Sequence, residues 1–225
     1  MEIKERLGRI VTLGLFDKIT SVKHNPDVLN KYVAAGNPGI VAHTYPHSIH
    51  IPEYFFMGGE KCHREDYTHR TVFGNSMLVD GIHSGWELLL KPVENREIKQ
   101  GDFIVINVDK DYFRHRHNDD EALFQLKLRR AIGKVNSTAT VESLAKLMQN
   151  TFAEPLDDED TKDLEDSLND ACTFYNRNEP LFLSATYHES KIHYSFHPID
   201  SIEYLVEGVA FGSDNGVVFK LPEEL

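Results

Sequence analysis

Short runs of strand-forming residues separated by turn residues occupy most of the chain after residue 70, and they constrain its fold more than any other feature. Val, Ile, Leu, Phe and Tyr dominate these runs. Gly81, Gly85, Gly101 and the Gly-rich tip at residues 212–216 separate several of them. We expect strands at residues 71–74, 87–91, 103–109, 123–128, 181–185, 192–196, 204–211 and 217–220. This pattern predicts a mainly β domain, built as a sandwich or a partly open barrel.

A stretch of helical character interrupts the strand pattern. Apolar residues recur at helical spacing in residues 141–148 and 161–175, on either side of the acidic run 157–160. We therefore expect a helical, acidic insertion at about residues 136–180. The acidic residues from 157 to 170 lack the central glycine of a calcium-binding loop, so a solvated helix face or an electrostatic partner surface is expected.

Residues 1–35 form an N-terminal arm before the breaker cluster 36–39. Ile3, Leu7, Ile10 and Val11 have helical spacing, and a second short periodic piece runs over residues 26–32. One helix and a fragment are too little for a helix-turn-helix, so no direct DNA-binding domain is expected. The arm either binds a partner or covers the β domain, which we place at residues 36–225.

Composition excludes several classes of protein. The 225 residues carry a formal net charge of −12, which argues against a protein that coats nucleic acid. No apolar run is long enough to span a bilayer, and Cys62 and Cys172 fit a reducing compartment, so we expect a cytoplasmic protein without a membrane anchor. Neither His115 and His117 nor the Cys62–His63 pair has a standard zinc spacing, so no metal or other cofactor is expected.

Ser76 is the first candidate for chemistry. It follows a predicted strand and Gly74, so it lies at a chain reversal where a hydroxyl is accessible and backbone N–H groups can face an oxyanion. The nucleophile elbow Gly-x-Ser-x-Gly is absent, because Leu78 occupies its last position. Serine after glycine in a turn is common, so this feature alone is weak support for catalysis.

The order of several motifs resembles the self-cleaving serine peptidases of the LexA, UmuD and phage-repressor family. Gly74-Asn75-Ser76-Met77 matches the family's Gly-x-Ser-Met, and the later Lys127 matches its general base. The segment at residues 33–38, Val-Ala-Ala-Gly-Asn-Pro, resembles the family's self-cleavage site. The run at residues 201–212 resembles its last core strand.

The resemblance implies a LexA/signal-peptidase-like β fold and a Ser76–Lys127 dyad that cuts the chain's own Ala35–Gly36 bond. Asn75, Ser76 and Met77 would form the oxyanion hole and cleft. It also implies homodimers, activation by RecA-nucleoprotein filaments and a place in the SOS response to DNA damage. Without a helix-turn-helix the chain is closer to UmuD, which assists a translesion DNA polymerase, than to the LexA transcriptional regulator.

The sequence also departs from the family pattern. Gly85-Trp86-Glu87 stands where the family has Gly-Asp, and Ser76 and Lys127 are 51 positions apart because of an extra loop at about residues 110–121. Arg129 and Arg130 are expected to point outward into solvent. Two other functions stay open: a non-catalytic dimerisation or regulatory module that binds a protein through the helical insertion, and a processing peptidase that acts on other chains.

Overall fold

The computed structural model describes residues 49–74, 77–94, 97–109, 111–112, 126–136, 138–149, 156–175, 180–188, 191–213 and 216–225, and the backbone of strand β1 (Tyr32–Ala35). The expected helices of the N-terminal arm therefore lie outside the described residues. So does the loop insertion, except for Asp111 and Tyr112.

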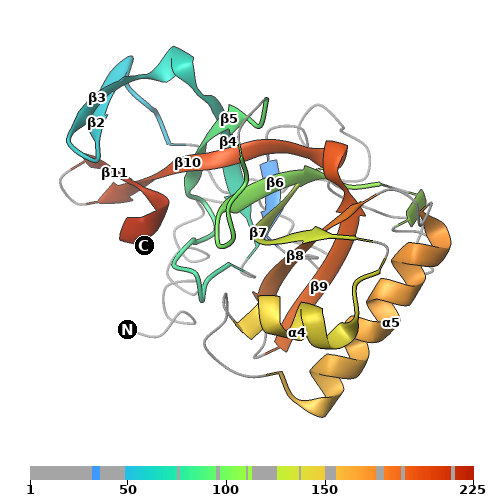
Figure 1. The fold of residues 1–225 in the computed structure, drawn as a ribbon. Helices are drawn as coiled ribbons and strands as arrows, with labels where there is room; N and C mark the ends of the chain where they lie inside the picture. Colours follow the sequence, from blue (N-terminus) through green and yellow to red (C-terminus); the bar gives the residue numbers. More distant parts are fainter. Residues whose placement is uncertain are drawn as a thin grey trace, which may run out of the picture.

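Six strands pair in a closed ring. Their order is β1, β4 (Thr68–Phe73), β5 (Glu87–Pro92), β10 (Ile202–Ser213), β6 (Phe103–Asn107) and β7 (Leu126–Val135), and β1 also pairs with β7. Both pairings of β1 are parallel, whereas the other pairings of the ring are antiparallel. The sheet continues from β7 to β8 (Leu181–His188) and β9 (Lys191–Pro198), and β11 (Gly216–Lys220) pairs with β10 (Figure 1). The predicted mainly β, LexA-like barrel fold is confirmed.

The interior of the ring is apolar because alternate residues of its strands point inward. Val72 of β4, Val105 of β6 and Leu128 of β7 are fully buried there. Met77 and Ile82, which follow β4, are buried in the same cluster. The segment that carries the candidate nucleophile is thus anchored to the core on its C-terminal side.

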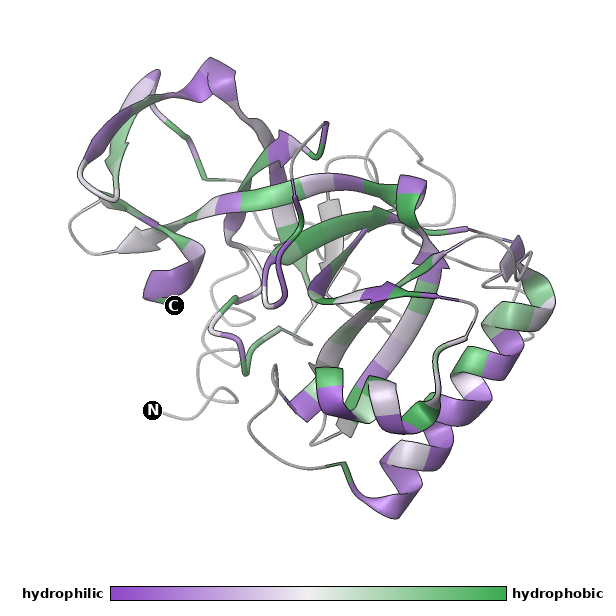
Figure 2. Cartoon of the chain, in the orientation of Figure 1, coloured by the Kyte–Doolittle hydropathy of each residue, from purple (hydrophilic) through white to green (hydrophobic). Residues whose placement is uncertain are grey.

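Two helices, α4 (Val141–Gln149) and α5 (Asp158–Phe174), lie between β7 and β8 in sequence, as the helical pattern predicted. They cover the outer side of β8 and β9 (Figure 1), where Leu144, Met148 and Leu164 join an apolar cluster with Phe196. Figure 2 shows apolar and polar residues alternating along α5, as expected for a helix with one buried face.

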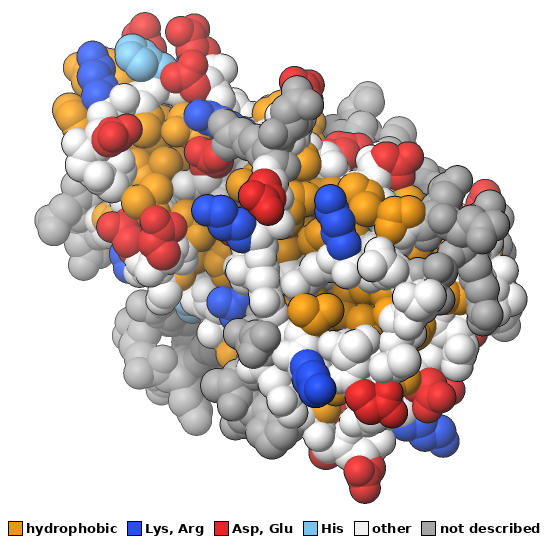
Figure 3. Space-filling model, viewed as in Figure 1, with side chains coloured by type: hydrophobic (Ala, Val, Ile, Leu, Met, Phe, Trp, Pro, Cys, Tyr) orange, Lys and Arg blue, Asp and Glu red, His pale blue; other side chains and the backbone are white. Residues whose placement is uncertain are grey.

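The acidic residues of α5 lie on its solvent-facing side. The side chain of Asp157 caps the helix by accepting a hydrogen bond of 2.7 Å from the backbone N–H of Asp160. Asp158, Glu159 and Asp163 are exposed. Acidic side chains gather over this end of α5 in Figure 3. The solvated-face interpretation of the acidic run therefore fits the structure.

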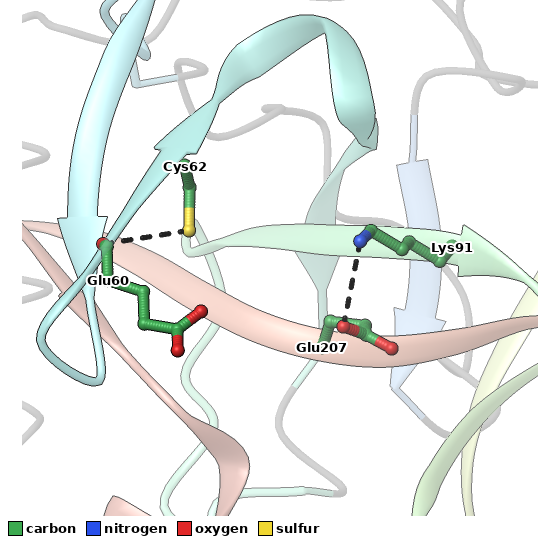
Figure 4. A network of polar contacts seen from close by, with 4 residues as sticks. All are labelled: Glu60, Cys62, Lys91 and Glu207. Carbon is green, nitrogen blue, oxygen red and sulfur yellow. Dashed lines mark hydrogen bonds and ion pairs between the residues drawn. The ribbon is translucent and has the colours of Figure 1, made fainter.

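A hairpin that was not expected projects from the opposite side of the molecule. Strands β2 (Tyr54–Met57) and β3 (Glu60–His63) precede a 3-10 turn, η2 (Arg64–Asp66), and Phe55 stacks on Phe219 of β11 with ring centroids 4.2 Å apart. Figure 4 shows Cys62 Sγ donating to the carbonyl of Glu60 at 3.8 Å, and the ion pair of Lys91 and Glu207 across β5 and β10 at 4.0 Å. Two further 3-10 turns are η3 (Ile199–Ser201) and η4 (Pro222–Glu224).

Several expected boundaries differ from those in the structure, and two of these differences bear on the site. The strand predicted at residues 123–128 continues to Val135, because Ala131, Ile132 and Val135 are buried against β8 and its neighbours. Tyr32, the last residue of the periodic piece predicted for residues 26–32, begins strand β1 and lies opposite Thr71 of β4, while residues 26–31 lie outside the described residues.

Candidate functional site

The predicted cleavage segment forms β1, which lies between the two strands that carry the candidate dyad. Ala34 is opposite Phe73 of β4 on one side and opposite Lys127 of β7 on the other, and Ala35 is opposite Leu128. Paired strands are about 4.8 Å apart. The backbone preceding the Ala35–Gly36 bond therefore lies within one strand spacing of the strand of Lys127 and of the strand that leads to Ser76.

Gly74 follows the end of β4, and residues 77–81 form a turn. Gly74 has a φ of 101°, in the region that favours glycine, and its N–H donates to Ser84 Oγ at 3.3 Å. The carbonyl of Met77 then accepts from the N–H groups of Asp80 (3.1 Å) and Ile82 (3.0 Å). Asn75 and Ser76 lie outside the described residues. The described residues nearest to them in sequence are Gly74 and Met77.

Lys127 is buried on β7, with 6% of its surface exposed. Its neighbour Leu128 points into the ring, so Lys127 points to the other face of the sheet. Burial disfavours an ammonium and favours the neutral amine that a general base needs. This burial agrees with the hypothesis that Lys127 lines a cleft.

The expectation that Arg129 and Arg130 point into solvent is wrong. Arg129 shares the face of Lys127, is 6% exposed, and donates from Nη1 to Thr186 Oγ1 at 2.9 Å. The face is covered because β8 and β9 curl over it, and Phe182 of β8 packs with Ile106 of β6.

Arg130 points to the opposite face and binds the turn after Ser76. Its Nη1 donates to Asp80 Oδ1 at 2.5 Å, and the Asp80 side chain is only 4% exposed. Burial raises the pKa of Asp80, and the charge of Arg130 opposes that shift. The ion pair thus ties the nucleophile turn to the strand that carries Lys127.

The departure at Gly85-Trp86-Glu87 has a structural explanation. Trp86 stacks on Phe211 of β10, with ring centroids 4.2 Å apart, and packs against the apolar cluster inside the ring. Glu87 is buried and its Oε1 accepts from Thr71 Oγ1 at 2.5 Å. Burial raises the pKa of Glu87, and the hydrogen bond from Thr71 opposes that shift. The acidic residue at this position therefore packs between β4 and β5.

No group of three or more His, Cys, Asp or Glu side chains that could hold a metal occurs among the residues that the structure describes. His69 Nε2 lies 3.0 Å from the carbonyl of Arg64, and Cys62 and Cys172 are both free cysteines. His115 and His117 lie outside the described residues. Within the described part of the chain, no helix is long and apolar enough to cross a membrane.

Sequence reasoning did not find the strand character of the cleavage segment. Tyr-Val-Ala-Ala begins with two residues that favour strands, but four residues are too few for a periodic signal. It also did not find the role of Asp80, whose partner Arg130 is 50 positions away.

The comparisons with known proteins agree with this geometry. Residues 27–127 match the model of the peptidase S24-like family. The match covers slightly less than half of the chain, and it includes β1, the turn with Ser76 and Lys127, while α4, α5, β8 and β9 lie beyond it. The chain matches none of the curated proteins and none of the solved structures compared with it. Over residues 27–127, the chain is therefore similar to the peptidase S24-like family.

Proposed function

We propose that this protein is a self-cleaving serine peptidase in which Ser76 and Lys127 cut the Ala35–Gly36 bond. The observation that carries the proposal is the position of β1, parallel to both β4 and β7, with Ala34 opposite Lys127. A substrate segment held as a strand beside its catalytic groups is preorganised for attack. The family match supports a peptidase, and the register supports the choice of bond.

The proposed mechanism needs two proton transfers by one lysine. The neutral amine of Lys127 takes the proton of Ser76 Oγ, and Oγ attacks the carbonyl carbon of Ala35. Backbone N–H groups near Asn75, Ser76 and Met77 stabilise the oxyanion. The Lys127 ammonium then gives its proton to the nitrogen of Gly36, which leaves. Water hydrolyses the remaining ester between Ser76 and Ala35.

Two features of the described residues support Lys127 as the base. It is almost fully buried, and the buried Arg129 shares its face of β7, so both solvation and charge disfavour a second cation there. The Arg130–Asp80 ion pair fixes β7 against the turn of the nucleophile. Together these features hold the base and the turn in a fixed relation.

The test is the intact mass of the purified full chain after incubation at alkaline pH. Cleavage after Ala35 gives fragments of 35 and 190 residues. We expect both fragments from the wild type and neither from Ser76→Ala or Lys127→Met. Lys134→Met is the matched control, because Lys134 is an exposed lysine on the same strand, and it should be cut like the wild type.

The rate constant should not change on 100-fold dilution, because β1 reaches its neighbours within one chain. A rate proportional to concentration would favour a peptidase that acts on other chains. An intact wild-type chain under all conditions, with RecA, single-stranded DNA and nucleotide present, would refute the proposed activity. That result would favour a non-catalytic module that binds a protein through α4 and α5.

We further propose that cleavage serves the response to DNA damage in a UmuD-like role, with homodimers, RecA filaments as activator and a translesion polymerase as partner. The support is the motif order, which resembles that family. The experiment is to add RecA filaments to the mass assay: an increase in the cleavage rate supports this role, and an unchanged rate counts against it.

A further inference from the structure

A cavity of about 70 Å³ lies beside Lys127, between the end of β6, the start of β7 and β9. Its polar lining includes Asp109, Lys127, Arg129, Tyr175, Ser195 and His197. One water molecule needs about 10–15 Å³ of such space, so the cavity has room for about five atoms of that size. That is the size of a small tetrahedral ion.

His197 presents two polar ring atoms to the cavity. Only 5% of its surface is exposed, and neither ring nitrogen has a hydrogen-bond partner among the described residues. Burial, together with the charge of Arg129, lowers the pKa of His197 to about 3, so the ring is neutral. A neutral ring has one N–H donor and one nitrogen acceptor. Buried polar groups in proteins are almost always paired, so a ligand that both accepts and donates is expected here.

The charge of the lining favours an anion. Arg129 is cationic, the amine of Lys127 can donate hydrogen bonds and becomes a second cation when it is protonated, and Asp109 is the only carboxylate among the described residues that line the cavity. Asp109 Oδ1 already accepts from the backbone N–H groups of Asp111 (3.0 Å) and Tyr112 (3.1 Å). Burial and the charge of Asp109 raise the pKa of Tyr175, so its hydroxyl stays neutral and can donate.

We propose that this cavity binds a small protonated oxyanion of the phosphate class through Arg129, Lys127 and His197. Hydrogen phosphate has oxygen acceptors for the N–H groups and an O–H donor for the unprotonated nitrogen of His197. An anion beside Lys127 stabilises its ammonium form. If the proposed function holds, the bound anion therefore inhibits self-cleavage, since only the neutral amine accepts the proton of Ser76.

The binding test uses the full chain with Ser76→Ala, which stays whole, in Hepes buffer. We expect inorganic phosphate to raise the melting temperature saturably, and calorimetry to give one site per chain. Potassium chloride of equal ionic strength should have no comparable effect. An equal response to chloride, or no saturation, would overturn the proposed site.

Variants locate the site. His197→Phe removes both ring nitrogens and Arg129→Gln removes a charge, so each should weaken phosphate binding at least about 10-fold, as for the loss of a charge-assisted hydrogen bond. Lys134→Gln, an exposed lysine of β7, is the control and should bind as before. If Arg129→Gln does not fold, Arg129→Lys keeps the charge but loses the planar fork, and it too should bind more weakly. Unchanged binding in the folded variants would overturn the assignment.

The cleavage assay separates this inference from the proposed function. At a phosphate concentration ten times the measured Kd, wild-type self-cleavage should be slowed about 11-fold, the factor by which the free protein is depleted. Phosphate binding without any self-cleavage would leave the site in place and refute the proposed function. Self-cleavage without phosphate binding would refute the site and leave the function.

Discussion

Acidification should destabilise the fold because His197 is buried in its neutral form. The pKa of His197 is about 3 in the folded protein, and a histidine in an unfolded chain has a pKa near 6.5. Below about pH 6.5 the unfolded state therefore takes up a proton that the folded state does not. The stability from the neutral ring is complete above pH 6.5 and is lost as the pH falls toward 3. Between pH 7.5 and 5.0 this loss is about 2 kcal/mol.

The assay is urea unfolding at both pH values in buffers without oxyanions, for the wild type and for His197→Phe. A loss of about 2 kcal/mol corresponds to a fall of about 4–8 °C in melting temperature for a chain of this size. Burial raises the pKa of Asp80 and of Glu87, so these carboxyls stabilise the fold as the pH falls. The quantity to compare is therefore the pH-dependent change in the wild type minus that in His197→Phe, where the two carboxyls cancel.

His63→Gln, at an exposed histidine of β3, is the control and should keep the wild-type pH dependence, because it retains His197. The free energy of unfolding should fall between pH 7.5 and 5.0 by about 2 kcal/mol more in the wild type than in His197→Phe. An excess below about 0.5 kcal/mol would refute the reasoning, because a buried neutral histidine must give an excess of about 2 kcal/mol.

Three further predictions follow from packing and pairing. Arg130→Met should cost about 1–2 kcal/mol in urea unfolding, because it leaves the buried Asp80 carboxylate without its ion-pair partner while Arg130 itself is 30% exposed; a loss near zero would contradict this. Leu164→Ala, at a fully buried position of α5, should lower the free energy of unfolding in urea by about 2–5 kcal/mol. A far smaller loss would show that the packing of α5 contributes little to stability. Ala34→Pro should slow self-cleavage about 10-fold or more with an unchanged circular-dichroism spectrum, because proline removes a backbone N–H from a strand with neighbours on both sides; cleavage at the wild-type rate would show that β1 is not the bound substrate segment.

Most strands of the ring could be predicted because each is a short run of apolar, strand-forming residues between turns. The run over Phe103–Asn107 is an example, since four of its five residues are buried. The sequence also carries a local signal for the hairpin of β2 and β3. Gly58 and Gly59, with φ of 58° and 84°, form a Gly-Gly turn between two short runs, a common hairpin connection.

The burial of Arg129 could have been predicted in part. Residues two apart on a strand point to the same face, so an inward Lys127 implies an inward Arg129. The sequence does not show what makes burial of two cationic side chains possible, which is the return of β8 and β9 over that face. This cover comes from residues more than 50 positions later in the chain, so no local pattern reports it.

The position of β1 matters most for the proposed function. It could not be predicted, for a reason related to the one that hides the cover of Arg129. A parallel strand pairs only with distant segments, so its partners are set by the closure of the ring and not by its own sequence. Five residue pairs hold β1, three with β4 and two with β7. Cleavage after Ala35 would break the covalent connection of β1 to the rest of the chain. Among the described residues, only these strand pairs would then hold β1 in the ring. The same strand thus completes the barrel and presents the bond that the proposed dyad cuts, so release of the N-terminal fragment would open the ring between β4 and β7.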